Sequence, residues 1–420
     1  MKVRVPQLYW YGAKDMELDF PDRWEVNFCP PRGHDRPRLT AAEMQRAFEA
    51  PIGTPPLREL ARGRKQVAIL FDDITRPTRT YEIAPYVLQE LAAAGIADDQ
   101  IRFIAAVGTH GAHDNVAHRL KLGQEILEHF PVYNHNPYES CVEVGTTSRG
   151  TRLAVNREVM SCDLKIAIGT ILPHPQVGFG GGGKIILPGV SHIDSITHFH
   201  AHVPFSAPET IGPGNYDQNV MRMDFEEAAQ LAGLDFTVDC VVNLKGEIIA
   251  LFTGDPVQEP REAVELAKEV YATEHIPGLN VAVCNAFLKA SEAFVAIPTA
   301  LKALGMDGGS LVVIMNSPTG QVVHYLMRSF GSDYGGRLFS SRTLPPQFKI
   351  IILNPVKDLT CVDMFSNAKA VTWAKTWEEV RAVLESQHRD GARVAVYPDC
   401  TSQYLTAPAK ATSGAALSEA

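Results

Sequence analysis

From residue 66 onward the chain alternates short β-rich apolar runs with longer stretches of helical periodicity. The run QVAILFDD begins at residue 66, IRFIAAVG begins at residue 101, and a helical stretch at 115–130 follows. Strands that alternate with helices of ten or more residues form βαβ units, in which the strands run parallel. The alternation therefore predicts an α/β fold with a largely parallel sheet.

A second series of the same kind fills the later part of the chain, with apolar runs at 279–286, 310–316, 348–355 and 393–399 and helical stretches at 291–304 and 377–385. Between the two series, residues 235–255 predict a β-hairpin. We therefore expect two α/β domains, at 1–276 and 277–405. The small and polar residues at 406–420 predict a flexible tail, because they offer too little apolar surface to bury.

Composition excludes several classes of protein. The 420 residues are 45% hydrophobic and 21% charged, which is ordinary for a folded chain of about two to four domains. A net charge of −9 leaves no basic surface for phosphate backbones, so we expect no nucleic-acid partner.

The expected compartment is the cytoplasm. The apolar runs fall far short of the roughly 20 residues of a membrane helix, and the N-terminus has no apolar run typical of a secretory signal. We therefore expect no membrane attachment. The seven cysteines are scattered singly, which favours reduced thiols over a disulfide framework.

The segment 169–202 concentrates chemically active residues, because it holds five of the fourteen histidines and a glycine run that ends in Lys184. Such a run lets backbone approach a ligand closely and can direct several N–H groups at an anion. Gly178 to Lys184 also matches the opening of a phosphate-binding P-loop, although Ile185 follows where Ser or Thr would hold Mg²⁺. One alternative function is therefore a nucleotide-dependent hydrolase or kinase. The alternative without a function is that the glycine run is only a mobile loop.

Lys184 itself lies between flexible glycines and an apolar Ile-Ile-Leu sequence. Apolar surroundings lower the pKa of an amine and make it nucleophilic toward a carbonyl-type carbon. One interpretation is a covalent cofactor anchor, and the other is a lysine that pairs with a carboxylate or phosphate.

Three histidines, His198, His200 and His202, follow at alternate positions. Imidazole is the commonest transition-metal ligand, but no trio of nearby Cys or carboxylate residues completes a closed zinc site. A metal site completed by a non-protein group is therefore one interpretation, and ordinary surface histidines are the other.

Two further motifs follow the first two expected strands. Asp73, Thr75 and Arg76 come after the first strand, and His110 comes after the second. Because ligands in open α/β sheets gather outside the carboxyl ends of strands, both motifs should face one crevice. There Arg76 can hold a carboxylate through two hydrogen bonds, and His110 can transfer protons near neutral pH.

The combination of these motifs is more specific than any one of them. It resembles the nickel-dependent lactate racemase family in the sequences DITRP from Asp73, GTH from Gly108, HPQVGFGGGGK from His174 and PG from Pro188, and in a histidine sixteen residues after Lys184. The resemblance covers most of residues 5–275 and is looser beyond. It implies two α/β domains with the active site in the cleft between them. It also implies a nickel-pincer nucleotide (nickel pyridinium bisthiocarboxylate mononucleotide) as the cofactor.

The resemblance assigns roles position by position. Lys184 would carry the cofactor covalently, and His200 would be the ligand to nickel. His110 and His174 would form the acid/base pair, and Arg76 would hold the substrate carboxylate. Further contacts are expected to the cofactor from Asp73, Thr75, Gly181, Gly182 and Gly183, and to the substrate from Lys302, with Lys289 as the alternative.

The activity so implied is that of an isomerase, a racemase or epimerase that inverts C2 of a 2-hydroxy acid by transient hydride transfer to the cofactor. Other enzymes would have to build that cofactor. The Tyr-Pro and Gln that the family has early in the second domain are missing here, so the substrate is lactate or a larger 2-hydroxy acid such as a sugar acid. A non-catalytic relative that binds a metal or nucleotide is the remaining alternative.

Overall fold

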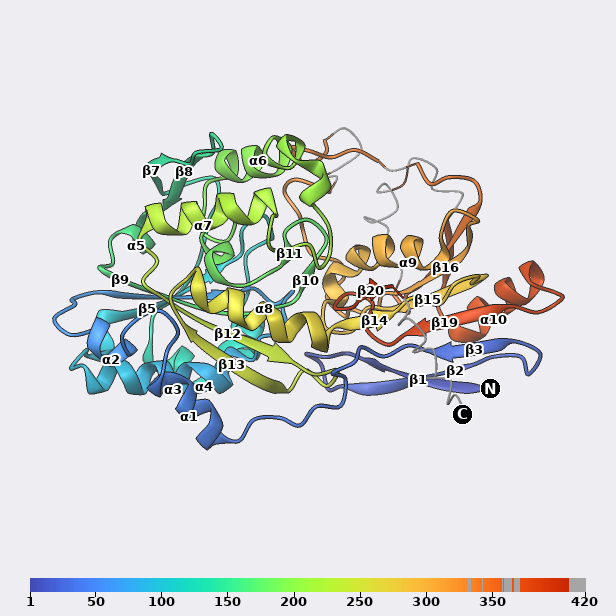
Figure 1. The fold of residues 1–420 in the computed structure, drawn as a ribbon, viewed down its shortest axis with the longest axis horizontal. Coiled ribbons are helices and arrows are strands. Elements are labelled where there is room, and N and C mark those ends of the chain that lie inside the picture. Colours follow the sequence, from blue (N-terminus) through green and yellow to red (C-terminus); the bar gives the residue numbers. More distant parts are fainter. Residues whose placement is uncertain are drawn as a thin grey trace, which may run out of the picture.

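The structure is a computed structural model that describes residues 1–328, 330, 334–341, 343–356, 358, 365 and 371–407. Two six-stranded sheets lie side by side, each flanked by helices (Figure 1). The α/β class expected from the sequence is confirmed, because the strands are largely parallel and alternate with helices along the chain. Most of the expected tail lies outside the described residues.

The first sheet contains the strands expected at the start of the alternation. In spatial order its strands are β13 (Ile248–Gly254), β12 (Phe236–Val242), β9 (Leu164–Thr170), β4 (Val67–Asp72), β5 (Ile101–Ala106) and β6 (Val132–Asn134). All neighbours are parallel except β12 and β13, which form the expected hairpin. The helices of this half are α1 (Ala41–Glu49), α2 (Leu57–Leu60), α3 (Thr80–Ala93), α4 (Asn115–His129), α5 (Arg157–Met160), α6 (Ile193–Ala201), α7 (Val220–Ala232) and α8 (Gln258–Val270).

The second sheet is parallel throughout. In spatial order its strands are β18 (Val371–Ala374), β17 (Phe348–Leu353), β16 (Gly309–Ile314), β15 (Val281–Asn285), β19 (Arg393–Tyr397) and β3 (Glu25–Phe28). The helical stretch expected at 291–304 is divided into the 3₁₀ helix η5 (Ala290–Val295) and α9 (Ala296–Leu304), and α10 (Trp377–Gln387) lies farther along the chain.

Smaller elements complete the fold. Among the described residues, four two-stranded pairs are present, β1 (Lys2–Gln7) with β2 (Lys14–Asp19), β7 (Cys141–Thr146) with β8 (Arg152–Asn156), β10 (Pro173–His174) with β11 (Gly178–Phe179), and β14 (Ala272–Glu274) with β20 (Tyr404–Thr406). Short 3₁₀ helices are η1 (Asp98–Gln100), η2 (Gly182–Ile185), η3 (Val203–Ser206) and η4 (Pro208–Thr210).

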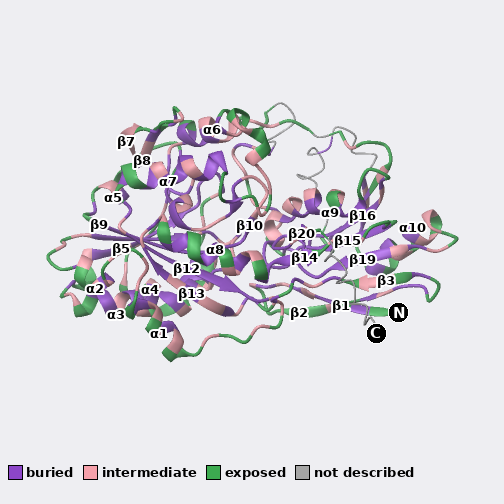
Figure 2. Cartoon of the chain, viewed as in Figure 1, coloured by how far each residue is buried: buried purple, intermediate pink, exposed green. Residues whose placement is uncertain are grey.

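Both sheets are buried on their two faces (Figure 2). In β4, Ile69 packs in the core on one face and Leu70 packs in the core on the other. In β15, Val283 and Cys284 are divided between two cores in the same way. Strands covered by helices on both sides require continuous apolar sequence, which explains the uninterrupted apolar runs of the chain.

The N-terminal residues pack with the second sheet, although the sequence places them in residues 1–276. β3 pairs in parallel with β19, and Trp24 is buried in the same core as β15 and β19. The second sheet therefore contains a strand from the beginning of the chain. The domain boundary at 277 itself stays a prediction.

Two further properties concern the described residues only. None of their helices has both the length and the apolar character needed to cross a membrane. Six of the seven cysteines are described, and each of them is a free thiol.

We expect Trp24→Ala to destabilise the second sheet selectively. Trp24 is only 5% exposed, and removing a buried Trp side chain costs about 3–5 kcal/mol in free energy of unfolding. Hydrogen exchange should accelerate in β19 and β15 more than in β4 and β5.

Phe28→Ala is the matched control, because Phe28 belongs to the same N-terminal segment and is 42% exposed. It should change the free energy of unfolding by less than about 1 kcal/mol. Equal acceleration of exchange in both sheets of Trp24→Ala would contradict the assignment of the N-terminal segment to the second sheet.

Candidate active site

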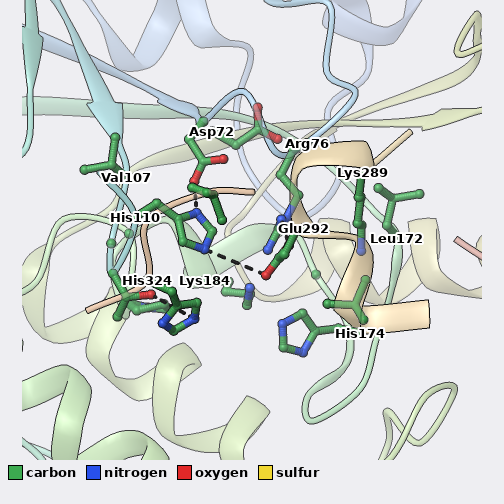
Figure 3. A pocket seen from close by; sticks show the side chains of 18 of the residues that line it. Asp72, Arg76, Val107, His110, Leu172, His174, Lys184, Lys289, Glu292 and His324 are labelled. Atoms are coloured by element: carbon green, nitrogen blue, oxygen red, sulfur yellow. Dashed lines mark hydrogen bonds and ion pairs between the residues drawn. The ribbon is translucent and has the colours of Figure 1, made fainter. Parts of the chain in front are cut away.

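A cavity of about 320 Å³ lies where residues from both sheets meet (Figure 3). It is bounded by the segments that follow β4, β5 and β9, and by the segments that follow β15 and β16. The strand-end rule therefore located the crevice correctly. Of the residues predicted from the sequence, those that line it are Asp73, Arg76, His110, His174, Gly181, Gly182, Lys184 and His200.

The turn after β4 holds Arg76 in a fixed orientation. The backbone N–H and the hydroxyl of Thr75 both donate to Asp73 Oδ1, which closes the turn. Arg76 Nη1 donates to Thr75 Oγ1 at 2.6 Å and to Glu292 Oε2 at 2.6 Å. Because Glu292 belongs to η5, this buried ion pair links the first half of the chain to the second.

His110, just after β5, has the arrangement of a general base. Its Nδ1–H donates to Asp73 Oδ2 at 2.6 Å. Burial alone would raise the pKa of Asp73, but His110 and Arg76 beside it hold that pKa well below its usual range. Because an ionised carboxylate only accepts, the proton of the neutral ring stays on Nδ1 and the lone pair of Nε2 faces the cavity.

His174, in β10, has the opposite tautomer. The backbone N–H groups of Gln176 and Val177 donate to its Nδ1 at 3.2 and 3.3 Å. Burial and the nearby lysines Lys184 and Lys289 hold the pKa of His174 well below its usual range. The neutral ring therefore carries its proton on Nε2 and is a hydrogen-bond donor in the same cavity.

Lys184, in η2, is a partly buried amine with an altered proton affinity. Burial, followed by the positive charge of Arg76, lowers its pKa to about 7. Its Nζ forms no hydrogen bond or ion pair with any of the described residues. An amine that is substantially neutral near pH 7 and lines a cavity is suited to forming a covalent bond with an electrophilic carbon.

His200 is the one of the three clustered histidines that lines the cavity. It lies near the C-terminal end of α6, where its Nδ1–H donates to the carbonyl oxygen of Ile196 at 2.8 Å. This bond leaves the Nε2 lone pair available, which is the arrangement of a typical metal-ligating histidine. His198 instead contacts Thr151 through Nδ1, and the His202 side chain is exposed.

The second half of the chain adds Glu292 and His324, which sequence analysis did not place in the cavity, and Lys289, its alternative to Lys302. Lys289 Nζ donates to the carbonyl oxygen of Pro173 at 3.2 Å, and burial lowers its pKa to about 8. Glu292 lies between Arg76 and His110, and His324 lies 5.3 Å from His110 between ring centroids. Contacts between the two halves therefore build the site.

Comparison with known proteins agrees with this geometry. Residues 11–212 match the model of the lactate racemase N-terminal domain family. The chain is 26% identical to a lactate racemase of Thermoanaerobacterium thermosaccharolyticum, over 93% of this chain and 97% of that protein. It is 25% identical to a lactate racemase of Lactiplantibacillus plantarum, over 85% of this chain and 88% of that protein.

The chain is similar to lactate racemases along most of its length. Its fold is similar to that of the Thermoanaerobacterium lactate racemase apoprotein, with a TM-score of 0.74 at 22% identity over 97% of this chain and 100% of the other. A protein of Thermotoga maritima has a TM-score of 0.65 at 18% identity, over 88% of this chain and 99% of that one. The lactate racemases are isomerases, so the resemblance first seen in the sequence motifs is confirmed.

The contacts of the glycine run do not fit a P-loop. The N–H of Gly182 donates to Asp239 Oδ2 at 2.7 Å, so this group is not free to bind a phosphate. Asp239 also lines the cavity next to the run and would repel a phosphate if ionised. Lys184 lies in a 3₁₀ turn instead of the long helix that follows a P-loop. These contacts oppose the nucleotide hydrolase or kinase alternative.

Five of the expected contact residues have other partners or lie outside the cavity. Lys302 does not line the cavity, because its Nζ donates to the carbonyl oxygen of Leu405 at 3.1 Å. Lys289 is the lysine of this segment that reaches the cavity. The carboxylate of Asp73, which was expected to contact the cofactor, accepts hydrogen bonds from His110 and Thr75. The N–H of Gly182 donates its hydrogen bond to Asp239. Thr75 and Gly183 lie behind the cavity wall, where Thr75 supports Arg76.

The trio His110, Glu292 and His324 has ligand atoms within 4.8 Å of one another, a spacing that could accommodate a metal ion. However, the backbone N–H groups of Leu326 and Met327 donate to His324 Nδ1 at 3.3 and 3.2 Å. The proton of the neutral His324 ring is then on Nε2, which makes that atom a donor and a poor ligand. His200, whose Nε2 lone pair is free, is better suited to a metal.

Amine labelling should single out Lys184. Only the neutral amine reacts, so its labelling rate should rise with pH and reach half its maximum near pH 7, the value to which burial lowers this pKa. An ordinary lysine titrates near 10.4, so exposed lysines should react mainly at higher pH. Peptide mass spectrometry after brief acetylation at several pH values measures the profile.

The control is Arg76→Gln, which removes a positive charge that lowers the Lys184 pKa. Its Lys184 profile should move to higher pH. A Lys184 profile that coincides with those of the exposed lysines in the unmodified chain would show that the amine is not desolvated.

Proposed function

We propose that this chain is a racemase or epimerase that inverts C2 of a 2-hydroxy acid, with a nickel-pincer nucleotide bound covalently to Lys184. The observation that carries the proposal is one cavity that holds a buried reactive amine, a metal-competent histidine and two histidines of opposite tautomer. A simple binding protein has no need for the acid/base pair.

The cofactor fits the groups that the cavity offers. The unpartnered amine of Lys184 would form the covalent link, and Nε2 of His200 would bind the nickel. When bound, the group supplies reversible hydride acceptance, which avoids removing the weakly acidic C2–H as a proton. The remaining steps depend on side chains of the chain itself.

Arg76 and Lys289 would hold the substrate carboxylate. Both are buried cations that line the cavity, and Arg76 keeps its Nη1 on Thr75 and Glu292 while no described residue accepts from its Nη2 or Nε. That unused edge of the guanidinium matches a carboxylate through two parallel hydrogen bonds. Lys289 would replace Lys302, the substrate contact expected from the sequence.

His110 and His174 would transfer the proton of the C2 hydroxyl. His110 Nε2 can take that proton, and Asp73 stabilises the imidazolium that results. His174 Nε2–H faces the same cavity and can donate to the substrate oxygen. In the view of Figure 3, the Lys184 amine lies between the two rings. An inversion that runs in both directions requires a proton-transfer group on each side of the carbon.

The lactate racemase relatives support a small-molecule substrate, whereas the enzymes that build the cofactor and a cytoplasmic location stay predictions of the sequence. The test of the proposal is to produce the chain together with enzymes that assemble the cofactor. The denatured intact mass, peptide mapping and nickel content then show whether Lys184 is loaded.

We expect Lys184→Arg to abolish the covalent adduct, because a guanidinium is not a nucleophile at neutral pH. His200→Ala should lose nickel and keep the organic adduct, because it removes a metal ligand and leaves the amine. Intact mass reports the adduct, and elemental analysis of the native protein reports nickel.

His198→Ala is the matched control, since His198 lies two residues from His200 but contacts Thr151 outside the cavity. It should keep both adduct and nickel. Normal loading of Lys184→Arg would show that Lys184 is not the covalent anchor. Unchanged nickel content in His200→Ala would show that His200 is not the nickel ligand.

We expect His110→Ala and His174→Ala each to slow racemisation of the loaded enzyme by about 10²–10⁴-fold, the usual contribution of a positioned acid or base. Chiral chromatography of a 2-hydroxy acid started from either enantiomer measures the rate. His129→Ala, an exposed position on α4, should retain the full rate. A full rate in either of the first two variants would remove that histidine from the acid/base pair.

A further inference from the structure

We propose that Glu292 makes this site specific for 2-hydroxy acids that carry a hydroxyl group on C3, so that a 2,3-dihydroxy acid binds better than lactate. The inference rests on the proposed function, because it uses Arg76 as the carboxylate site and His110 as the acceptor of the C2 hydroxyl. It adds a residue of the second half of the chain that chooses among such acids.

Glu292 uses its two oxygen atoms differently. Oε2 accepts from Arg76 Nη1 at 2.6 Å, which holds the guanidinium and leaves its other edge for the substrate. Oε1 lies 3.7 Å from His110 Nε2, and no described residue donates a hydrogen bond to it. Figure 3 shows this carboxylate between Arg76 and His110, facing the cavity.

Glu292 Oε1 and His110 Nε2 face each other, 3.7 Å apart, without a hydrogen bond between them. Because Nδ1 of His110 is bonded to Asp73, the neutral form of the ring has a lone pair on Nε2, so the two atoms are both acceptors. Burial alone would raise the pKa of Glu292, but Arg76 beside it lowers it to about 2, so the side chain is ionised. A ligand that fits this pair must bring two donors at a similar spacing.

Hydroxyl groups on neighbouring carbons meet that requirement. With the carboxylate on Arg76 and the C2 hydroxyl on His110 Nε2, a C3 hydroxyl can donate to Glu292 Oε1. Lactate has a methyl group at C3, which would desolvate a buried carboxylate and return no hydrogen bond. Sites built to bond a substrate hydroxyl discriminate strongly against analogues that lack it, because the protein group is then left unpaired.

The direct test uses the unloaded protein, with glycerate and lactate as probes that differ only at C3. Titration calorimetry or ligand-observed NMR should give glycerate at least about a tenfold lower Kd than lactate. In Glu292→Ala the two Kd values should agree within about threefold, and Glu292→Gln, which keeps one acceptor without the charge, should lie between.

Thr75→Val is the matched control, because Thr75 also bonds Arg76 Nη1 but does not line the cavity. It should weaken both acids and leave their ratio unchanged. The preference for glycerate over lactate is measured a second time as the ratio of their kcat/KM values for racemisation by the loaded enzyme. This second ratio tests the role of Glu292 if binding to the unloaded protein is too weak to measure.

The outcomes separate this inference from the proposed function. If lactate and glycerate are equivalent in the unmodified chain, or if Glu292→Ala keeps the preference, the inference is overturned while racemase activity stands. If 3-amino-2-hydroxypropanoate outcompetes glycerate, the group recognised is an ammonium and the hydroxyl assignment is overturned. If the loaded enzyme inverts none of the three acids, the proposed function fails, and the binding ratio still decides the role of Glu292.

Discussion

The largely buried ion pair between Arg76 and Glu292 joins the two halves of this protein at the cavity. Removing both charges from water is costly and is offset only when each finds a partner, so separating the pair would leave an uncompensated buried charge at a cost of about 3–5 kcal/mol. Arg76 follows β4 in the first sheet, and Glu292 lies in η5 after β15 in the second. The pair therefore brings the carboxyl ends of two sheets together, and the site exists only where they meet.

The scaffold also decides what each histidine of the cavity can do, through the group that it places at Nδ1. A carboxylate at Nδ1 of His110 and a backbone carbonyl at Nδ1 of His200 both leave a lone pair on Nε2. Backbone N–H groups at Nδ1 of His174 leave a proton on Nε2 instead. Three chemically identical side chains are thus suited to different roles, as a base, a ligand and a donor, because their local backbone and neighbours differ.

Sequence reasoning located the residues whose positions follow from local rules. Arg76 and His110 come directly after apolar strands, and parallel strands end at one edge of a sheet, so their convergence could be predicted. Lys184 could be identified from the glycines and apolar residues on either side of it. The alternation of strands and helices is also a local pattern, and it predicted both sheets.

Residues that depend on long-range packing could not be found in this way. Glu292 is 216 positions from Arg76, and nothing in its neighbourhood indicates that it pairs there. Lys302 and Lys289 stayed alternatives in the sequence, because nothing local to either lysine shows which of them reaches the cavity. The backbone also leaves helical geometry at Glu292, inside the stretch expected to be one helix at 291–304. β3 illustrates the same limit, since its pairing with β19 links the two ends of the chain.

The charges of the cavity link cofactor attachment to proton transfer. After burial, the positive charges of Lys184 and Lys289 are the main causes of the low pKa of His174. Converting the Lys184 amine to an amide removes one of these charges, and the carboxylate of a bound substrate adds an opposite one. Both changes raise the pKa of His174 toward its ordinary value. Under the proposed function, His174 therefore holds a proton more readily when the cavity contains both cofactor and substrate.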